Sequence, residues 1–152
     1  MNTQTGDLLV ITRGILCHQV NCIGATGGLA GALRRKWPLA FYAYFQRVPC
    51  YGQNLGTSVI GRAPPSVWPE LYIAHVFGQL QPGANTDLEA VDSALAELAK
   101  EIARHPELSA LPIFVPHLMG CGLGGGRWDQ YLPLLEKHLP SAIVIKLPES
   151  PK

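Results

Sequence analysis

Five of the seven residues in the run 120–126 are glycines, and this run lies between a β-branched segment and an amphipathic one that begins near Trp128. Glycine lets the backbone approach a ligand closely. A strand, a glycine loop and a helix N-terminus in this order present unpaired N–H groups and a positive dipole end to an anion. The run therefore predicts a phosphate-binding loop, with a flexible surface loop as the alternative.

A second glycine-rich segment, residues 24–28, also follows a buried run and precedes a helix-like one. The run 15–22 predicts a strand, and 29–37 predicts a helix that ends before Pro38, because proline restricts the residue that precedes it. Two such loops on one small domain suggest a clamp that holds a pyrophosphate from both sides.

Two better-known glycine motifs fit this sequence less well. The pattern of Gly120, Gly122 and Gly125 formally matches the dinucleotide fingerprint, and Glu149 lies close to the expected distance beyond it. However, no later strands follow to complete that fold, and Glu149 lies in a proline-flanked tail, so a hydride-transferring enzyme is not expected. A P-loop is excluded, because neither glycine loop is followed by Lys-Ser or Lys-Thr.

The composition indicates one globular domain spanning residues 1–152, with 47% hydrophobic residues and a formal net charge of +1. Four cysteines form no CxxC pair and no evident disulfide framework, which favours a reducing compartment. Neither an export signal nor a membrane-spanning run is present, so we expect a cytoplasmic monomer that contacts no membrane. No metal or cofactor is expected.

Strands alternate with helices along the sequence, which predicts an α/β domain with a mostly parallel or mixed sheet. The expected strands are residues 2–5, 15–22, 57–62, 71–77, 113–116 and 142–147. The expected helices are 29–37, 39–47, one from 86 to about 104, and one ending near 139. Thr86 and Glu89 have the spacing of a capping box at the start of the third helix. Pro133 predicts a kink in the last helix or a separate first turn.

Four motifs, in this order and covering nearly the whole sequence, resemble those of macrodomains. They are Gly6-Asp7-Leu8-Leu9, Val20-Asn21-Cys22 followed by Gly27-Gly28-Leu29-Ala30, the run 73–79, and the run 120–128. The branch they are most similar to contains the terminal ADP-ribose protein glycohydrolase of animals and the yeast ADP-ribose 1″-phosphate phosphatase. The resemblance implies a three-layer fold, with a mixed central sheet flanked by helices, that binds ADP-ribose or an ADP-ribosylated protein or metabolite. Nucleic acid would be a partner only where it is ADP-ribosylated.

The resemblance also implies a set of ligand-binding residues. Asp7 matches the aspartate that accepts a hydrogen bond from the adenine amino group; a turn or cap aspartate is the alternative. Asn21 matches a position beside the distal ribose, and a structural strand-end asparagine is the alternative. Backbone N–H groups of the glycine loops would hold the diphosphate. The implied set is Asp7, Leu8, Asn21, Gly27, Gly28, Leu29, Gly120, Cys121, Gly122, Leu123, Gly124, Gly125, Gly126, Arg127 and Trp128.

The candidate catalytic residues are His18 and Asn21. His18 corresponds to a histidine shared by the yeast phosphatase and its relatives, and it could position or activate a water; a satisfied core histidine is the alternative. His75 and His117 stand where relatives often have Asn and Arg. Gly124 stands where the animal glycohydrolase has its catalytic aspartate, and no lysine lies on a glycine loop, so a Schiff-base mechanism is not supported.

The resulting functional hypothesis is hydrolysis at the distal ribose of ADP-ribose derivatives. The substrates would be acyl-linked mono-ADP-ribose, ADP-ribose 1″-phosphate or O-acetyl-ADP-ribose. A reader module that binds ADP-ribose without turnover is the alternative, and an unrelated nucleotide-phosphate binding protein is a third. A bulky residue at Gly124 is expected to abolish binding and to leave the fold intact.

Overall fold

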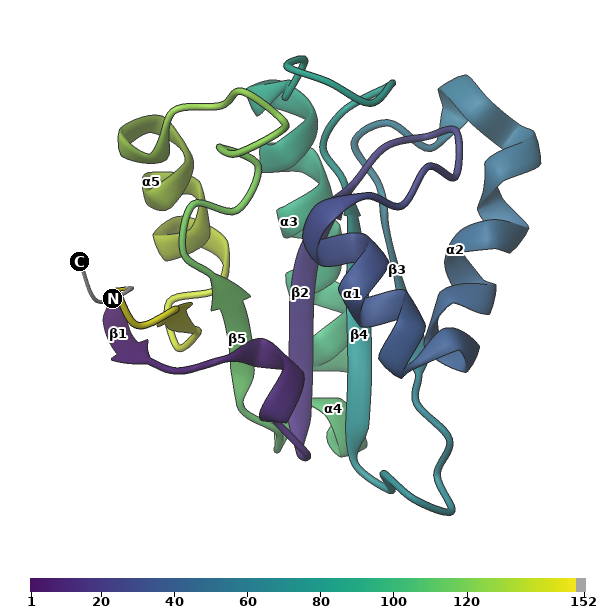
Figure 1. Ribbon diagram of the computed structural model, residues 1–152, viewed down its shortest axis with the longest axis vertical. Coiled ribbons are helices and arrows are strands. Elements are labelled where there is room, and N and C mark those ends of the chain that lie inside the picture. The colour runs from purple at the N-terminus through teal and green to yellow at the C-terminus, as the bar shows by residue number, and fades with distance from the viewer. Residues whose placement is uncertain (150–152) are drawn as a thin grey trace.

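A six-stranded mixed sheet forms the centre of the protein in the computed structural model, which describes residues 1–149 (Figure 1). The order across the sheet is β1-β6-β5-β2-β4-β3. All neighbouring pairs are parallel except β3 and β4, which are antiparallel. The strands are β1 (Asn2–Thr5), β2 (Gly14–Val20), β3 (Ser58–Arg62), β4 (Leu71–Phe77), β5 (Ile113–Pro116) and β6 (Ile143–Lys146).

Helices cover both faces of the sheet, which gives three layers (Figure 1). One core contains side chains of α3, α4 and α5, and the other contains side chains of α1, α2 and two 3-10 helices, η1 and η2. The helices are α1 (Gly28–Lys36), α2 (Tyr42–Arg47), α3 (Leu88–Arg104), α4 (Pro106–Ser109), α5 (Trp128–His138), η1 (Leu8–Val10), η2 (Pro38–Phe41) and η3 (Val48–Gln53). Within residues 1–149, no helix has both the length and the apolar character needed to cross a bilayer.

Strand β2 lies near the centre of the sheet and is buried on both faces. Ile15 and Cys17 belong to the core on the α3–α5 side, while Leu16 and Val20 belong to the core on the α1–α2 side. Because successive side chains of a strand point to opposite faces, His18 lies on the α1–α2 side. This alternation decides which residues can reach the loops above the sheet.

The expected strands agree with the observed ones to within two residues at each end, and the aromatic segment 39–47 differs more. It divides into η2 and α2, so its aromatic side chains do not all face inward. Phe41 and Tyr44 are buried, whereas Tyr42 is exposed. Helix α5 runs as one segment through Pro133, so the alternative of a separate first turn is wrong. Tyr131 and Leu135, which lie on either side of the proline, are both buried.

The predicted capping box at the start of α3 is wrong. Asp87 is the N-cap, and its Oδ1 accepts a hydrogen bond from Ala90 N at 3.1 Å. The Thr86 hydroxyl donates instead to Gly120 O at 2.8 Å. The helix start is shifted by one residue because the backbone amide of Thr86 bonds Gly124 O, and that of Asp87 bonds Gly78 O.

Replacing the cap tests this assignment. Asp87→Ala removes the acceptor for Ala90 N and is expected to lower the free energy of unfolding by about 1 kcal/mol. Glu89→Ala, the matched control on the same turn, should change it by less than about 0.5 kcal/mol, because no capping box forms. Urea unfolding measures both values. An equal loss in the two variants would contradict the assignment of Asp87 as the cap.

Candidate functional site

A groove lies at the carboxyl ends of the parallel strands, where open α/β sheets bind ligands. It consists of two adjoining cavities with volumes of about 400 and 450 Å³. The first cavity lies between the two glycine loops, and the second is lined by Asp7, Leu8 and the end of β6. Both cavities share four lining residues, which makes the groove continuous. The shared residues are Leu29, Pro116, His117 and Leu118.

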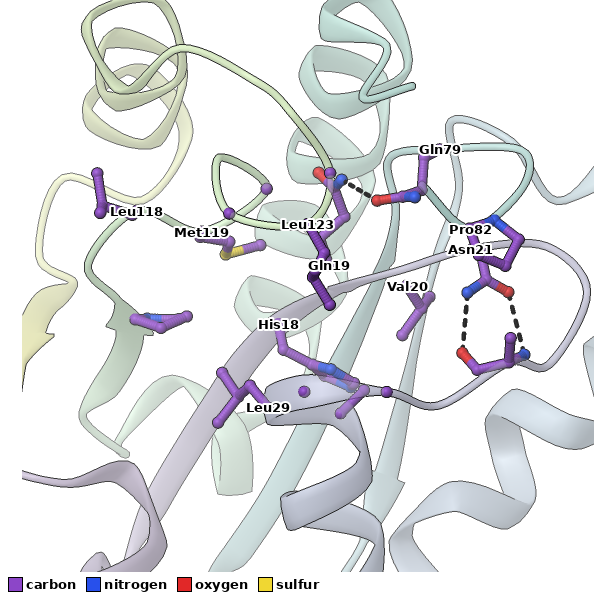
Figure 2. A pocket seen from close by; sticks show the side chains of 18 of the residues that line it. His18, Gln19, Val20, Asn21, Leu29, Gln79, Pro82, Leu118, Met119 and Leu123 are labelled. Carbon is purple, nitrogen blue, oxygen red and sulfur yellow. Dashed lines mark hydrogen bonds between the residues drawn. The ribbon is translucent and has the colours of Figure 1, made fainter. Parts of the chain in front are cut away.

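Asn21, directly after β2, shapes the first glycine loop. Its Oδ1 accepts from Ala25 N at 3.2 Å, and its Nδ2 donates to Ala25 O at 2.8 Å (Figure 2). The same Oδ1 also accepts from Ile23 N at 3.1 Å. The Tyr44 hydroxyl donates to Asn21 O at 2.7 Å. Asn21 also lines the first cavity. The side-chain amide of Asn21 therefore holds the loop in place, as in the structural alternative, and the residue also lines the groove.

The N-terminus of α1 opens into the first cavity. Gly27 is the N-cap and supplies no side-chain acceptor, and the first turn carries no acidic residue. Gly27, Gly28, Leu29 and Ala30 all line the cavity. The first N–H groups of a helix have no intrahelical partner, so this end of α1 offers backbone donors and a positive dipole to an anion.

The second glycine loop is held by a set of hydrogen bonds that we name the Gln19 network. Gln19 Nε2 donates to Gln79 Oε1 and to Thr86 Oγ1, both at 2.7 Å. Tyr131 OH donates to Gln19 Oε1 at 3.0 Å, and Thr86 Oγ1 donates to Gly120 O at 2.8 Å. One side chain of β2 thus connects the loop after β4, the loop after β5 and helix α5.

Close packing against this network explains some of the glycines and corrects one expectation. A Cβ on Gly120 would lie 2.6 Å from Gln19 Oε1, and one on Gly124 would lie 2.5 Å from Thr86 Oγ1. A bulky residue at Gly124 would therefore displace the loop, so the expectation that the fold would stay intact is wrong. Gly122, by contrast, has open space around its Cβ position.

The two loops approach each other across the first cavity. A Cβ on Gly28, whose φ is +52°, would lie 3.4 Å from Cδ1 of Leu123. The predicted residues that line the first cavity are His18, Asn21, Gly27, Gly28, Leu29, Gly120, Gly122, Leu123 and Gly124. Those that line the second are Asp7, Leu8 and Leu29.

Five predicted ligand-binding residues belong to the lining of neither cavity. They are Cys121, Gly125, Gly126, Arg127 and Trp128. The Arg127 side chain is exposed and pairs with Asp129 at 2.9 Å, and the Trp128 ring packs edge-on against His117. The groove also contains residues that were not assigned to the site from sequence, among them Gln19, Gln79, Leu118, Met119 and Lys146.

Asp7 caps the 3-10 helix η1 and also lines the second cavity. Its Oδ1 accepts from Leu9 N at 2.9 Å, as in the cap alternative. A carboxylate has two oxygens and about four acceptor positions, so the cap leaves acceptor capacity for a ligand in the second cavity.

His18 forms a buried pair with His75, its register partner on β4. His18 Nε2 lies 2.7 Å from His75 Nδ1, and His75 Nε2 lies 2.9 Å from Ala40 O. A carbonyl oxygen only accepts, so His75 Nε2 carries the proton and His18 Nε2 donates to His75 Nδ1. His18 Nδ1 is then an acceptor, and it has no partner within the described residues.

Burial holds both imidazoles neutral. It lowers the pKa of His75 to about 4. It also lowers the pKa of His18 well below its usual range, and the neighbouring His75 adds to this. At neutral pH the Nε2 proton of His18 is therefore engaged with His75, and its buried Nδ1 is an acceptor that carries no proton. In the part of the chain that the structure describes, no group of three or more His, Cys, Asp or Glu side chains could hold a metal ion.

No protein-family model matches the sequence, and no curated protein matches it. Solved structures do match it. The macrodomain of Mycobacterium tuberculosis DarG has a TM-score of 0.75 at 24% identity, covering 98% of this chain and 97% of that chain. The macrodomain of Thermus aquaticus DarG has a TM-score of 0.77 at 24% identity, covering 97% of each chain. The chain has the macrodomain fold.

The three-layer macrodomain fold expected from the four motifs is thus confirmed. A protein of unknown function from Bacteroides thetaiotaomicron shares it, with a TM-score of 0.79 at 25% identity over 97% of each chain. Thermosipho africanus DarTG, whose structure contains ADP-ribose, has a TM-score of 0.74 at 18% identity over 99% of this chain and 43% of that chain.

The buried histidine pair predicts an acid-sensitive fold. In the unfolded chain both imidazoles take up a proton near pH ~6.5, whereas the folded protein keeps His75 neutral down to about pH 4. The unfolded state binds more protons in this window, so the free energy of unfolding falls as the pH drops. The expected slope is about 1.4 kcal/mol per pH unit for each histidine.

Urea unfolding at several pH values between about 7 and about 4.5 measures this slope. The double variant His18→Leu/His75→Leu removes both groups and should flatten it. A wild-type stability that does not change across the window would contradict the neutral pair.

Proposed function

We propose that this protein binds ADP-ribose in the groove, with the adenine at Asp7 and the diphosphate and distal ribose between the two glycine loops. The observation that carries the proposal is the continuity of the two cavities. One end presents an acidic side chain, and the other presents two glycine loops and the uncapped N-terminus of α1. An elongated ligand with an amino-bearing base at one end and an anion farther along fits this order.

The charge distribution supports a diphosphate held by the backbone. Within residues 1–149, the side chains that line the first cavity include no lysine and no arginine. Backbone N–H groups of α1 and of the second glycine loop would therefore neutralise the anion. Such donors are fixed by the fold and need no reorganisation on binding.

We further propose that the protein hydrolyses a bond at the distal ribose. His18 lines the first cavity, and its neutral Nδ1, which is buried and has no partner among the described residues, would accept from a water or a ribose hydroxyl that enters beside the ring. Asn21 would lie beside His18 at the distal ribose. Most of the rate enhancement would come from the orientation of the substrate and from preorganised backbone donors. The substrates would be acyl-linked mono-ADP-ribose, ADP-ribose 1″-phosphate or O-acetyl-ADP-ribose. The motif His18-Gln19-Val20-Asn21-Cys22 supports placement near the yeast phosphatase.

The reader alternative has its own support. Within the described chain, no carboxylate and no lysine line the first cavity, and Gly124 replaces the aspartate of the animal glycohydrolase. The Asn21 amide is engaged with the loop it shapes. Under this alternative the partner is an ADP-ribosylated protein, metabolite or nucleic acid end, held without turnover.

Gly122 offers a clean test of binding. Gly122→Val places a branched side chain at the first cavity from a position with open space and no positive φ, so the fold should remain while the affinity for ADP-ribose falls at least about tenfold. Gly52→Val is the matched control, because Gly52 has the same open space and lies outside the groove. Calorimetric titration measures both. Unchanged affinity in Gly122→Val would overturn the assignment of the groove.

Turnover is tested on two substrates. We expect the wild-type protein to release ADP-ribose from a glutamate-ADP-ribosylated protein or phosphate from ADP-ribose 1″-phosphate. His18→Phe should slow that release while ADP-ribose binding persists, because the donors of the glycine loops are unchanged. Binding of ADP-ribose with no release from either substrate, and none from O-acetyl-ADP-ribose, would overturn the proposed hydrolysis in favour of the reader alternative.

A further inference from the structure

Leu118 has a backbone conformation that its side chain disfavours. Its φ is +64°, and no other non-glycine residue of the described chain has a positive φ. Met119 N donates to Pro116 O at 3.1 Å, so residues 116–119 form a turn with Leu118 in the third position. Turns with a positive φ there normally use glycine or asparagine. Leu118 is therefore a branched residue at a position where glycine or asparagine would have less backbone strain.

The Leu118 side chain lies at the junction of the two cavities. It lines both of them and is 46% exposed. Leu29, from the first turn of α1, also lines both cavities and is 36% exposed. Figure 2 shows the two leucines on separate elements, one on the loop after β5 and one on α1. We name this pair the leucine saddle.

We propose that Leu118 is a specificity-determining residue that favours ligands long enough to span both cavities. It would contact such a ligand where the ligand passes over the leucine saddle from the second cavity to the first. This inference rests on the proposed function. A ligand that bridges the cavities covers apolar side chains that are otherwise exposed to water, which favours binding. A ligand confined to one cavity covers only the part of each leucine that faces that cavity. Residues with strained backbone conformations cluster at ligand sites, where the strain is part of how the site contacts its ligand.

Three variants test the inference by calorimetry and thermal unfolding. Leu118→Gly and Leu118→Asn both suit a positive φ, so their thermal midpoints should equal or exceed that of the wild-type protein. Their affinity for ADP-ribose should nevertheless fall about tenfold. Leu39→Asn, at a leucine that is 45% exposed and lies outside both cavities, should leave the affinity unchanged.

Adenine, titrated by NMR, distinguishes a bridging ligand from a short one. It would occupy the second cavity alone and cover only the part of Leu118 that faces that cavity, so its affinity should fall less in the Leu118 variants than the affinity for ADP-ribose. Unchanged ADP-ribose affinity in those variants would overturn the inference, as would a fall in affinity accompanied by a lower thermal midpoint or by an equal loss for adenine. Wild-type protein that binds no ADP-ribose would instead overturn the proposed function, and this inference with it.

Discussion

The side-chain amide of Gln19 is the constraint on which the groove depends. It is the centre of the Gln19 network, and both of its polar atoms are bonded to segments that are distant in sequence. The loops after β4 and β5 pack against it so closely that a Cβ on Gly78 or Gly120 would lie 2.4 or 2.6 Å from Gln19 Oε1. A buried amide that lost one of these partners would leave a polar group unsatisfied. The network therefore fixes the second glycine loop in one arrangement.

Because side chains alternate along β2, its two polar residues, His18 and Gln19, lie on opposite faces of the sheet. Gln19 points to the side of α3 and α5, where Tyr131 meets it, and His18 points to the opposite side, where His75 and Phe41 surround it. The histidine pair is neutral, because burial opposes the charged form. The first cavity thus has neutral polar side chains at its base, and under the proposed function the fixed donors of the glycine loops and of α1 would hold the anion.

Apolar side chains complete the groove. Leu29, Leu118 and Leu123 are all exposed around the first cavity. Leu123 faces the position of Gly28 across that cavity. Exposed leucines gathered at a groove are typical of ligand contacts, whereas scattered ones need no explanation. Polar backbone donors beside apolar walls suit a ligand that alternates between phosphate and sugar.

The sequence by itself determined the strands, both glycine loops and the mixed α/β architecture, because these depend on local patterns of side-chain type and on motifs that occur in a fixed order. It misplaced the start of α3, since Thr86 and Asp87 are equally good caps until Gly120 O, 34 residues away, engages the Thr86 hydroxyl. It left open the roles of Asn21 and Asp7, which satisfy local backbone donors and also face the groove. It gave no sign that His18 would meet His75 or that Gln19 would meet Tyr131, because those partners are 57 and 112 residues away. Only the register of the parallel strands and the packing of α5 bring them together, and such contacts leave no periodic signal in the chain.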